Sequence, residues 1–212
     1  MSYNLEEQDQ IENLRDFWSR WGTLISSLVL IVALAWASYA GWQWWQARQS
    51  TQASALFGQL NKEIAAGHLQ QAAPVWADLQ SKFADSPYAQ MGGLAMAKAY
   101  ADAGKTADAE TLLHWTAEHG VSDSYRATAM LNLSALQVDA KQLPAALATV
   151  KQSPAPTFEA LFATRRGDIY ALLGKTQEAR KAYEDAMKQL PPNSGYRQLV
   201  QLKLESVGGQ AS

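Results

Sequence analysis

Residues 21–47 read WGTLISSLVLIVALAWASYAGWQWWQA, and this stretch determines how the rest of the chain is interpreted. No Asp, Glu, Lys or Arg lies between Arg20 and Arg48, which leaves 27 consecutive residues without a formal charge. A bilayer core about 30 Å thick needs about 20 apolar residues at a rise of about 1.5 Å each. Because backbone polar groups must be paired within hydrocarbon, the stretch is predicted to form one transmembrane helix. The alternative is a buried core helix, but such helices rarely run this long uncharged.

The rest of the chain has the composition of one soluble domain. Two of the 18 basic and five of the 20 acidic residues precede the apolar stretch, so the part that follows is close to neutral. Near-neutrality argues against nucleic-acid binding, and the absence of cysteine excludes disulfides and Cys-ligated metals. We expect an amphipathic cytoplasmic tail at 1–21, a membrane helix at 22–45, a soluble domain at 46–207 on the other side of the membrane and a disordered end at 208–212.

Charges and aromatic residues at the ends of the stretch predict its orientation. Arg15 and Arg20 flank its N-terminal side, whereas only Arg48 lies close to the other side. The excess of basic residues predicts a cytoplasmic N-terminus. A cleavable signal peptide ending near Ala40 is the alternative, but the leading region is acidic and the apolar run exceeds a normal signal. Aromatic belts are expected at both interfaces, formed by Trp18, Trp21, Trp36, Tyr39, Trp42, Trp44 and Trp45.

Two further patterns predict helix surfaces in this region. Ala33, Ala37 and Gly41 recur every four residues, and small residues at that spacing let a second membrane helix approach closely. Small residues are also common in membrane helices generally, so this spacing leaves both interpretations open. An apolar stripe at helical spacing runs through the tail into the membrane and is formed by Ile11, Leu14, Trp18 and Trp21.

Four segments of the remaining chain share a helix–turn–helix outline. Their turns read AAGHLQQA (65–72), DAGKTADA (102–109), DAKQLPAA (139–146) and LLGKTQEA (172–179). Glycine is favoured after a helix because the left-handed conformation there strains other residues, and a small residue is favoured where two helices cross. The turn position is held by Gly67, Gly104, Lys141 and Gly174, and the crossing position by Ala72, Ala109, Ala146 and Ala179.

The fourth segment, residues 160–193, resembles a tetratricopeptide repeat. Seven residues fall at the signature places of that 34-residue repeat, although Arg166 stands where the family has a large apolar residue. We therefore expect an all-α solenoid of about four hairpins without a sheet, closed by a capping helix at 196–207. The seven residues are Gly167, Tyr170, Gly174, Ala179, Tyr183, Ala186 and Pro191.

The sequence contains no pattern typical of catalysis. The three histidines, His68, His114 and His119, lack the spacing of a metal site, and there is no phosphate-binding loop or nucleophile elbow. We therefore expect no enzyme activity, cofactor or metal, although residues distant in sequence could still form a site. The family's groove positions transfer to this chain as Met91, Leu94, Lys98, Asp102, Thr128, Leu131, Asp139, Leu161, Thr164 and Asp168. This mixed, rather apolar set favours an apolar peptide or a partner helix, and several members could instead pack internally.

The order of these parts resembles the YfgM family. The tail carries an E-x-x-Q-x-E-x-L-R-x-F-W run from Glu7 to Trp18, and the apolar stretch ends in GWQWW at 41–45. Degenerate tetratricopeptide hairpins follow, and the chain closes with LVQLKL at 199–204. The resemblance covers nearly the whole chain, and its tail and exit motifs are more specific than its repeats.

This resemblance implies a single-pass inner-membrane protein with a periplasmic repeat domain. It implies association with the SecYEG translocon and the membrane-anchored periplasmic chaperone PpiD, and assistance to nascent exported polypeptides. It implies no catalytic residues. The predicted function is thus a non-enzymatic scaffold or chaperone adaptor at the Sec translocon. The alternative is an assembly or stress-regulatory adaptor for other envelope complexes.

Overall fold

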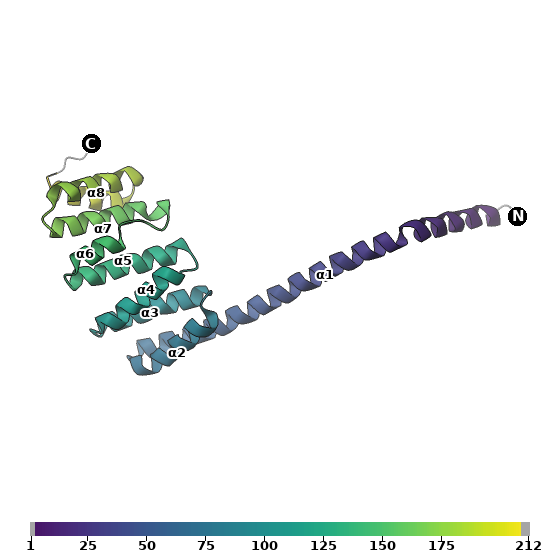
Figure 1. Ribbon diagram of the computed structural model, residues 1–212, viewed down its shortest axis with the longest axis horizontal. Helices are drawn as coiled ribbons and strands as arrows, with labels where there is room; N and C mark the ends of the chain where they lie inside the picture. Colours follow the sequence, from purple (N-terminus) through teal and green to yellow (C-terminus); the bar gives the residue numbers. More distant parts are fainter. Residues whose placement is uncertain (1–2, 209–212) are drawn as a thin grey trace. The chain divides into compact units, whose positions relative to one another are not determined.

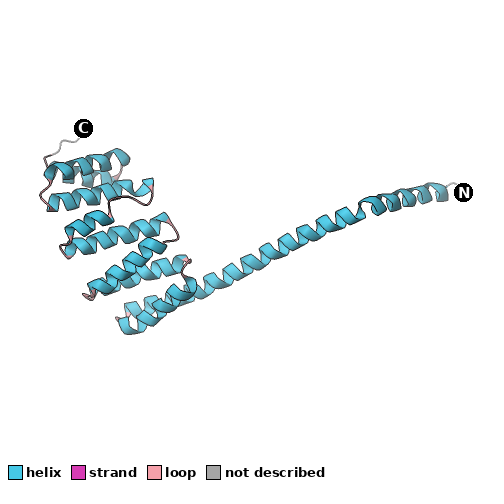
Figure 2. Cartoon of the chain, in the orientation of Figure 1, coloured by secondary structure: helices cyan, strands magenta, loops and turns pink. Residues whose placement is uncertain are grey.

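The computed structural model describes the backbone of residues 3–208, together with the side chains of Arg15 and of residues 17–208. Within these residues the chain is helical and contains no strand (Figure 2). The side chains of Ile11 and Leu14 and residues 209–212, for which a stripe and a disordered end are expected, lie outside this part. The elements are α1 (Tyr3–Ala65), α2 (Leu69–Phe83), α3 (Pro87–Asp102), α4 (Thr106–His119), α5 (Asp123–Asp139), α6 (Leu143–Thr149), the 3-10 helix η1 (Pro156–Phe158), α7 (Glu159–Leu172), α8 (Thr176–Gln189) and α9 (Gly195–Ser206).

The chain forms two compact units, Met1–Thr51 and Gln52–Ser212. The first unit contains the apolar stretch as part of α1. Among the described residues, the segment Phe17–Ala65 is the one helix long and apolar enough to cross a membrane, and its most apolar window buries nothing within the structure. Trp42 and Trp45 contact each other with ring centroids 5.6 Å apart, and the Arg48 guanidinium lies 5.3 Å from the Trp44 ring centroid. Aromatic rings and an arginine thus gather where the sequence predicts the membrane interface.

The second unit is a stack of helical hairpins (Figure 1). The C-terminal part of α1 pairs with α2 through one core cluster, in which Ala53 and Leu60 pack with Ala72 and Trp76. The pairs α3–α4, α5–α6 and α7–α8 follow, and α9 packs on α8. The all-α solenoid of four hairpins and a capping helix is therefore confirmed. The capping helix begins one residue earlier and ends one residue earlier than expected.

All four hairpin turns use the same backbone geometry. Gly67, Gly104 and Gly174 have φ between 71° and 75°, and Lys141 takes the same left-handed conformation at φ 60°. In each turn the N–H of the next residue donates to the carbonyl five residues earlier, as in His68 to Glu63 at 2.9 Å. This is the Schellman bond that closes a helix end. The four crossing alanines are all fully buried, so the repeat pattern read from the turns is confirmed.

The third hairpin departs from the others because α6 has only seven residues. The chain after it, Ser153-Pro154-Ala155-Pro156, cannot continue a helix because proline lacks the amide hydrogen. Arg166 compensates for the missing turns, since its guanidinium donates to the Val150 carbonyl at 3.0 Å and pairs with Glu159. The residue that departs from the repeat signature thus caps the short helix beside it.

Candidate functional site

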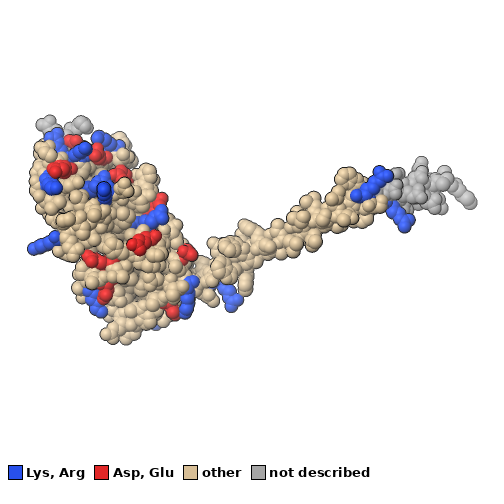
Figure 3. Space-filling view, viewed as in Figure 1, with Lys and Arg blue, Asp and Glu red and all other residues tan. Residues whose placement is uncertain are grey.

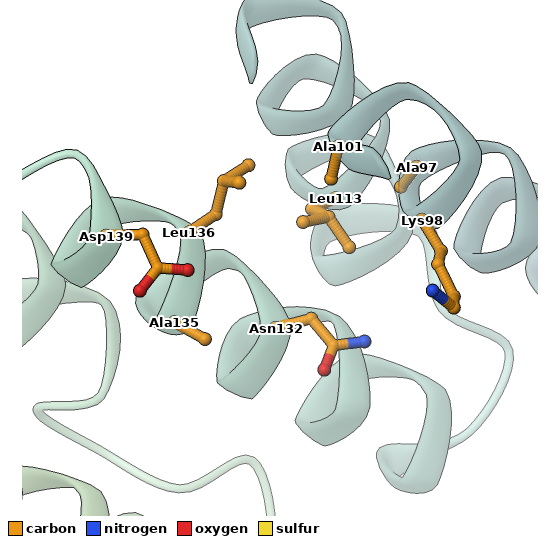
Figure 4. Close-up of a pocket in the computed structure, with 8 residues that line it drawn as sticks. All are labelled: Ala97, Lys98, Ala101, Leu113, Asn132, Ala135, Leu136 and Asp139. Atoms are coloured by element: carbon orange, nitrogen blue, oxygen red, sulfur yellow. The ribbon is translucent and has the colours of Figure 1, made fainter. Parts of the chain in front are cut away.

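A pocket of about 250 Å³ lies on the solenoid between α3 and α5. Leu113 of α4 and Leu136 of α5 give it an apolar floor, and alanines of α3 and α5 narrow its walls (Figure 4). Small-molecule sites measure about 300–1,000 Å³, so this volume is closer to one or two amino-acid side chains than to a cofactor. Its residues are Ala97, Lys98, Ala101, Leu113, Asn132, Ala135, Leu136 and Asp139.

Helical spacing explains why these residues share one surface. On α5, Asn132, Leu136 and Asp139 lie four and seven residues apart, which places them on one face. On α3, Lys98 and Ala101 lie within one turn of each other. In the close-up, Asn132 lies between Lys98 and Asp139 along the pocket (Figure 4).

The charges at the pocket do not balance. The Lys98 ammonium donates to the Asp102 carboxylate at 2.7 Å, one turn further along α3. Asp139 has no ion pair or hydrogen bond through its side chain within the described residues. Of the two charged side chains that line the pocket, Lys98 is therefore paired and Asp139 is unpaired. Elsewhere, basic and acidic groups intermingle over the solenoid face in Figure 3.

The other residues expected in a groove are spread along the inner helices. Met91 and Thr128 are exposed on α3 and α5. Leu94, Leu131 and Leu161 are half-buried, and the first two pack against core clusters. Of the expected groove residues, Lys98 and Asp139 thus line one pocket, and Asp102 contacts it only through its ion pair with Lys98.

Two of the expected groove residues have structural contacts instead. Thr164 is only 2 % exposed, and its hydroxyl donates to the Ala160 carbonyl at 2.8 Å. Asp168 accepts hydrogen bonds from the Tyr183 hydroxyl at 2.8 Å and from Lys203 at 2.7 Å. Burial raises the pKa of Tyr183, and its hydrogen bond to the Asp168 carboxylate raises it further. Asp168 therefore joins α7 to α8 and α9, whereas the Thr164 hydrogen bond lies within α7.

Transferring the family's groove positions missed Asn132, an uncharged polar residue that lines the pocket. The available signal was its spacing, because Asn132 lies four residues after Thr128 and seven before Asp139 on the same helix face. The small Ala97 and Ala101 carried no signal, since alanine is equally common in helix contacts and on helix surfaces.

The residues expected to contact a second membrane helix lie exposed on α1. Ala33, Ala37 and Gly41 have no partner segment within the described residues, and a Cβ added at Gly41 would meet nothing within 4 Å. No cluster of three or more metal-ligating side chains occurs in the searched part of the chain. Within the described residues, the geometry therefore offers a pocket on the solenoid and an exposed face of small residues on α1.

The chain matches known proteins over almost its whole length. Residues 15–209 match the family described as tetratricopeptide repeat-like domain. A protein of Neisseria gonorrhoeae named ancillary SecYEG translocon subunit is 29% identical over 98% of this chain and 100% of its own length. Proteins of the same name from Haemophilus influenzae and Escherichia coli K12 are 28% and 25% identical, covering 98% and 95% of this chain and 100% and 96% of their own.

Solved structures support the same fold at low sequence identity. A putative kinesin light chain from Podosopora anserina with nearly identical TPR-like repeats has a TM-score of 0.52 and 16% identity, over 74% of this chain and 86% of its own. BtubC from P. vanneervenii has a TM-score of 0.53 and 14% identity, over 76% of this chain and 82% of its own. At this identity the likeness concerns the solenoid alone.

Proposed function

Because this chain belongs to the tetratricopeptide repeat-like domain family, we propose that it is a non-enzymatic, membrane-tethered adaptor of the Sec translocon. The resemblance to the YfgM family stated from the sequence is confirmed by three relatives named ancillary SecYEG translocon subunit. The observation that carries the proposal is their near-complete coverage, which includes the apolar helix as well as the hairpins. A shared solenoid alone would not favour this partner over others.

The apolar helix fits an inner-membrane protein, and we propose that the solenoid lies on the periplasmic side. The support is the excess of Arg15 and Arg20 over Arg48 at the two ends of the span. A C-terminal fusion to a reporter that is active only in the periplasm should be active in cells. Activity of a cytoplasmic reporter at the same position would reverse the orientation.

The tether gives a physical reason for weak, selective binding by the solenoid. Anchoring a groove in the same bilayer as its partner raises its effective concentration to about the millimolar range. Contacts with nascent exported polypeptides, and with the chaperone PpiD, then need little intrinsic affinity. We propose that the solenoid assists polypeptides as they leave the translocon.

Copurification from mild detergent tests the assignment. An affinity-tagged chain expressed at its native level should retain SecYEG subunits after membrane solubilisation. A variant in which an unrelated membrane span replaces residues 21–47 is the control for capture through the solenoid alone. Recovery of other envelope complexes without SecYEG would support the alternative adaptor role, and photo-crosslinkers at Leu94 and Leu131 would identify the neighbours of the groove.

A further inference from the structure

Two aspartates lie at the helix ends beside the pocket between α3 and α5, and only one of them, Asp102, has a basic partner. Both helices end in aspartate, Asp102 and Asp139, and neither has a basic residue in its last turn. A helix C-terminus carries partial negative charge, so an acidic group there is unfavourable. The two aspartates also occupy equivalent places in the second and third repeats, 37 residues apart.

Nearby basic residues leave Asp139 without a counter-charge. Lys98 is held by Asp102 at 2.7 Å. Lys105, which follows α3, places its ammonium 5.5 Å from the Tyr100 ring centroid. Lys141, which follows α5, does not line the pocket. An unpaired carboxylate therefore stands beside an apolar pocket of about 250 Å³.

We propose that this pocket binds a segment of unfolded polypeptide in which a small apolar side chain is followed by lysine or arginine. The apolar side chain enters between Leu113 and Leu136, and the basic side chain pairs with Asp139. Asn132, which lines the pocket on the α5 side, can both donate to and accept from the backbone of the segment. The volume, the unpaired Asp139 carboxylate and the Asn132 amide each favour this occupant over a cofactor or an acidic peptide end.

This inference rests on the proposed function and specifies which polypeptides the groove selects. The probe is a labelled, unstructured peptide of Leu, Ala, Ser and Lys, compared with matched peptides that carry Glu or Gln in place of Lys. Affinity for the full-length protein in detergent is measured by fluorescence anisotropy. The wild type should bind the Lys peptide about five times more tightly than the Glu peptide at about 0.01 M salt, and the preference should shrink at about 0.15 M.

Four variants separate the effect of charge from the effect of shape. Asp139→Asn should weaken binding of the Lys peptide about two- to fivefold, and Asp139→Lys should reverse the preference toward the Glu peptide. Asp85→Asn, which removes an exposed carboxylate between α2 and α3, should change nothing. Ala101→Phe should fill the pocket and weaken all three peptides, and thermal unfolding checks that each variant is folded.

Two outcomes would overturn the inference. They are equal affinity for the Lys and Glu peptides, and an Asp139→Asn effect no larger than that of Asp85→Asn. Copurification of SecYEG is measured on the same variants. If SecYEG is retained while peptide selectivity is absent, the inference fails and the translocon assignment stands. If the protein selects the Lys peptide but does not copurify with SecYEG, the translocon assignment fails and the inference about the pocket stands.

Discussion

Lys203 on the capping helix α9 donates to both carboxylate oxygens of Asp168 on α7, at 2.7 and 2.8 Å. The Tyr183 hydroxyl donates to the same carboxylate from α8. One acidic group therefore joins three helices at the end of the solenoid. A terminal repeat needs such closure because its last apolar face has no further repeat to cover it.

Removing the ion pair between Lys203 and Asp168 should destabilise the packing of α9 on the last hairpin. Lys203→Met keeps most of the apolar stem but leaves Asp168 with one partner fewer. We expect the free energy of unfolding to fall by about 1–2 kcal/mol. Lys82→Met breaks an exposed pair with Asp78 and is the matched control, with an expected change within about 0.5 kcal/mol. Urea denaturation followed by circular dichroism measures both, and equal effects would show that Asp168 does not hold α9.

The raised pKa of Tyr183 predicts how stability depends on alkaline pH. Burial and the Asp168 hydrogen bond favour the neutral phenol in the folded state. Its contribution is fully present below the unfolded pKa of about 10 and is lost as pH rises toward the folded pKa. Tyr183→Phe should be less stable than wild type at pH 7, and this difference should shrink above about pH 10. A difference that stays constant over this range would contradict the assignment.

Gly167 lies against the Tyr183 ring, where a side chain has no room. A Cβ added there would lie 2.6 Å from Cδ1 of the ring. Gly167→Ala should therefore cost about 1–3 kcal/mol. Gly58→Ala is the control, because a Cβ at that helical position meets nothing within 4 Å and should stabilise by about 0.5–1 kcal/mol. The free energy of unfolding should therefore fall for Gly167→Ala and rise for Gly58→Ala.

Lys141 occupies the left-handed turn position that glycine holds in the other three hairpins. A backbone φ of 60° is strained for a residue that carries a Cβ, so Lys141→Gly should stabilise the protein by about 0.5–1 kcal/mol. Gly104→Ala, at φ 74° in the second hairpin, should destabilise it by about 1 kcal/mol. Thermal unfolding of both variants is compared with that of the wild type. A lower melting temperature for Lys141→Gly together with a higher one for Gly104→Ala would contradict the shared turn geometry.

The hairpins could be predicted from sequence because their determinants are local. A left-handed residue followed five positions later by a buried alanine fixes each turn, and neighbouring residues alone provide that pattern. The continuity of α1 from Tyr3 to Ala65 could not be read in the same way. A boundary was expected at residue 46, where composition changes, yet a change of composition leaves the helical hydrogen bonds intact.

The groove was harder to predict because it depends on how one repeat packs on the next. Three residues predicted from the family's groove positions have different surroundings. Lys98 is exposed, Thr164 is buried, and Asp168 forms an ion pair with Lys203. All three were predicted from their position in the repeat, so the sequence did not distinguish between them. For Asp168 the difference comes from α9, whose Lys203 forms the ion pair.

Photo-crosslinking in living cells, scanned over residues 24–45 of α1, tests the proposed place in the Sec translocon most directly. The account predicts adducts with a SecYEG subunit, concentrated on the face of Ala33, Ala37 and Gly41. Ala35 is the matched control for Ala37, because two residues turn a helix by about 200° and place it on the opposite side. If no position in the span yields an adduct with any SecYEG subunit, the proposed function is wrong.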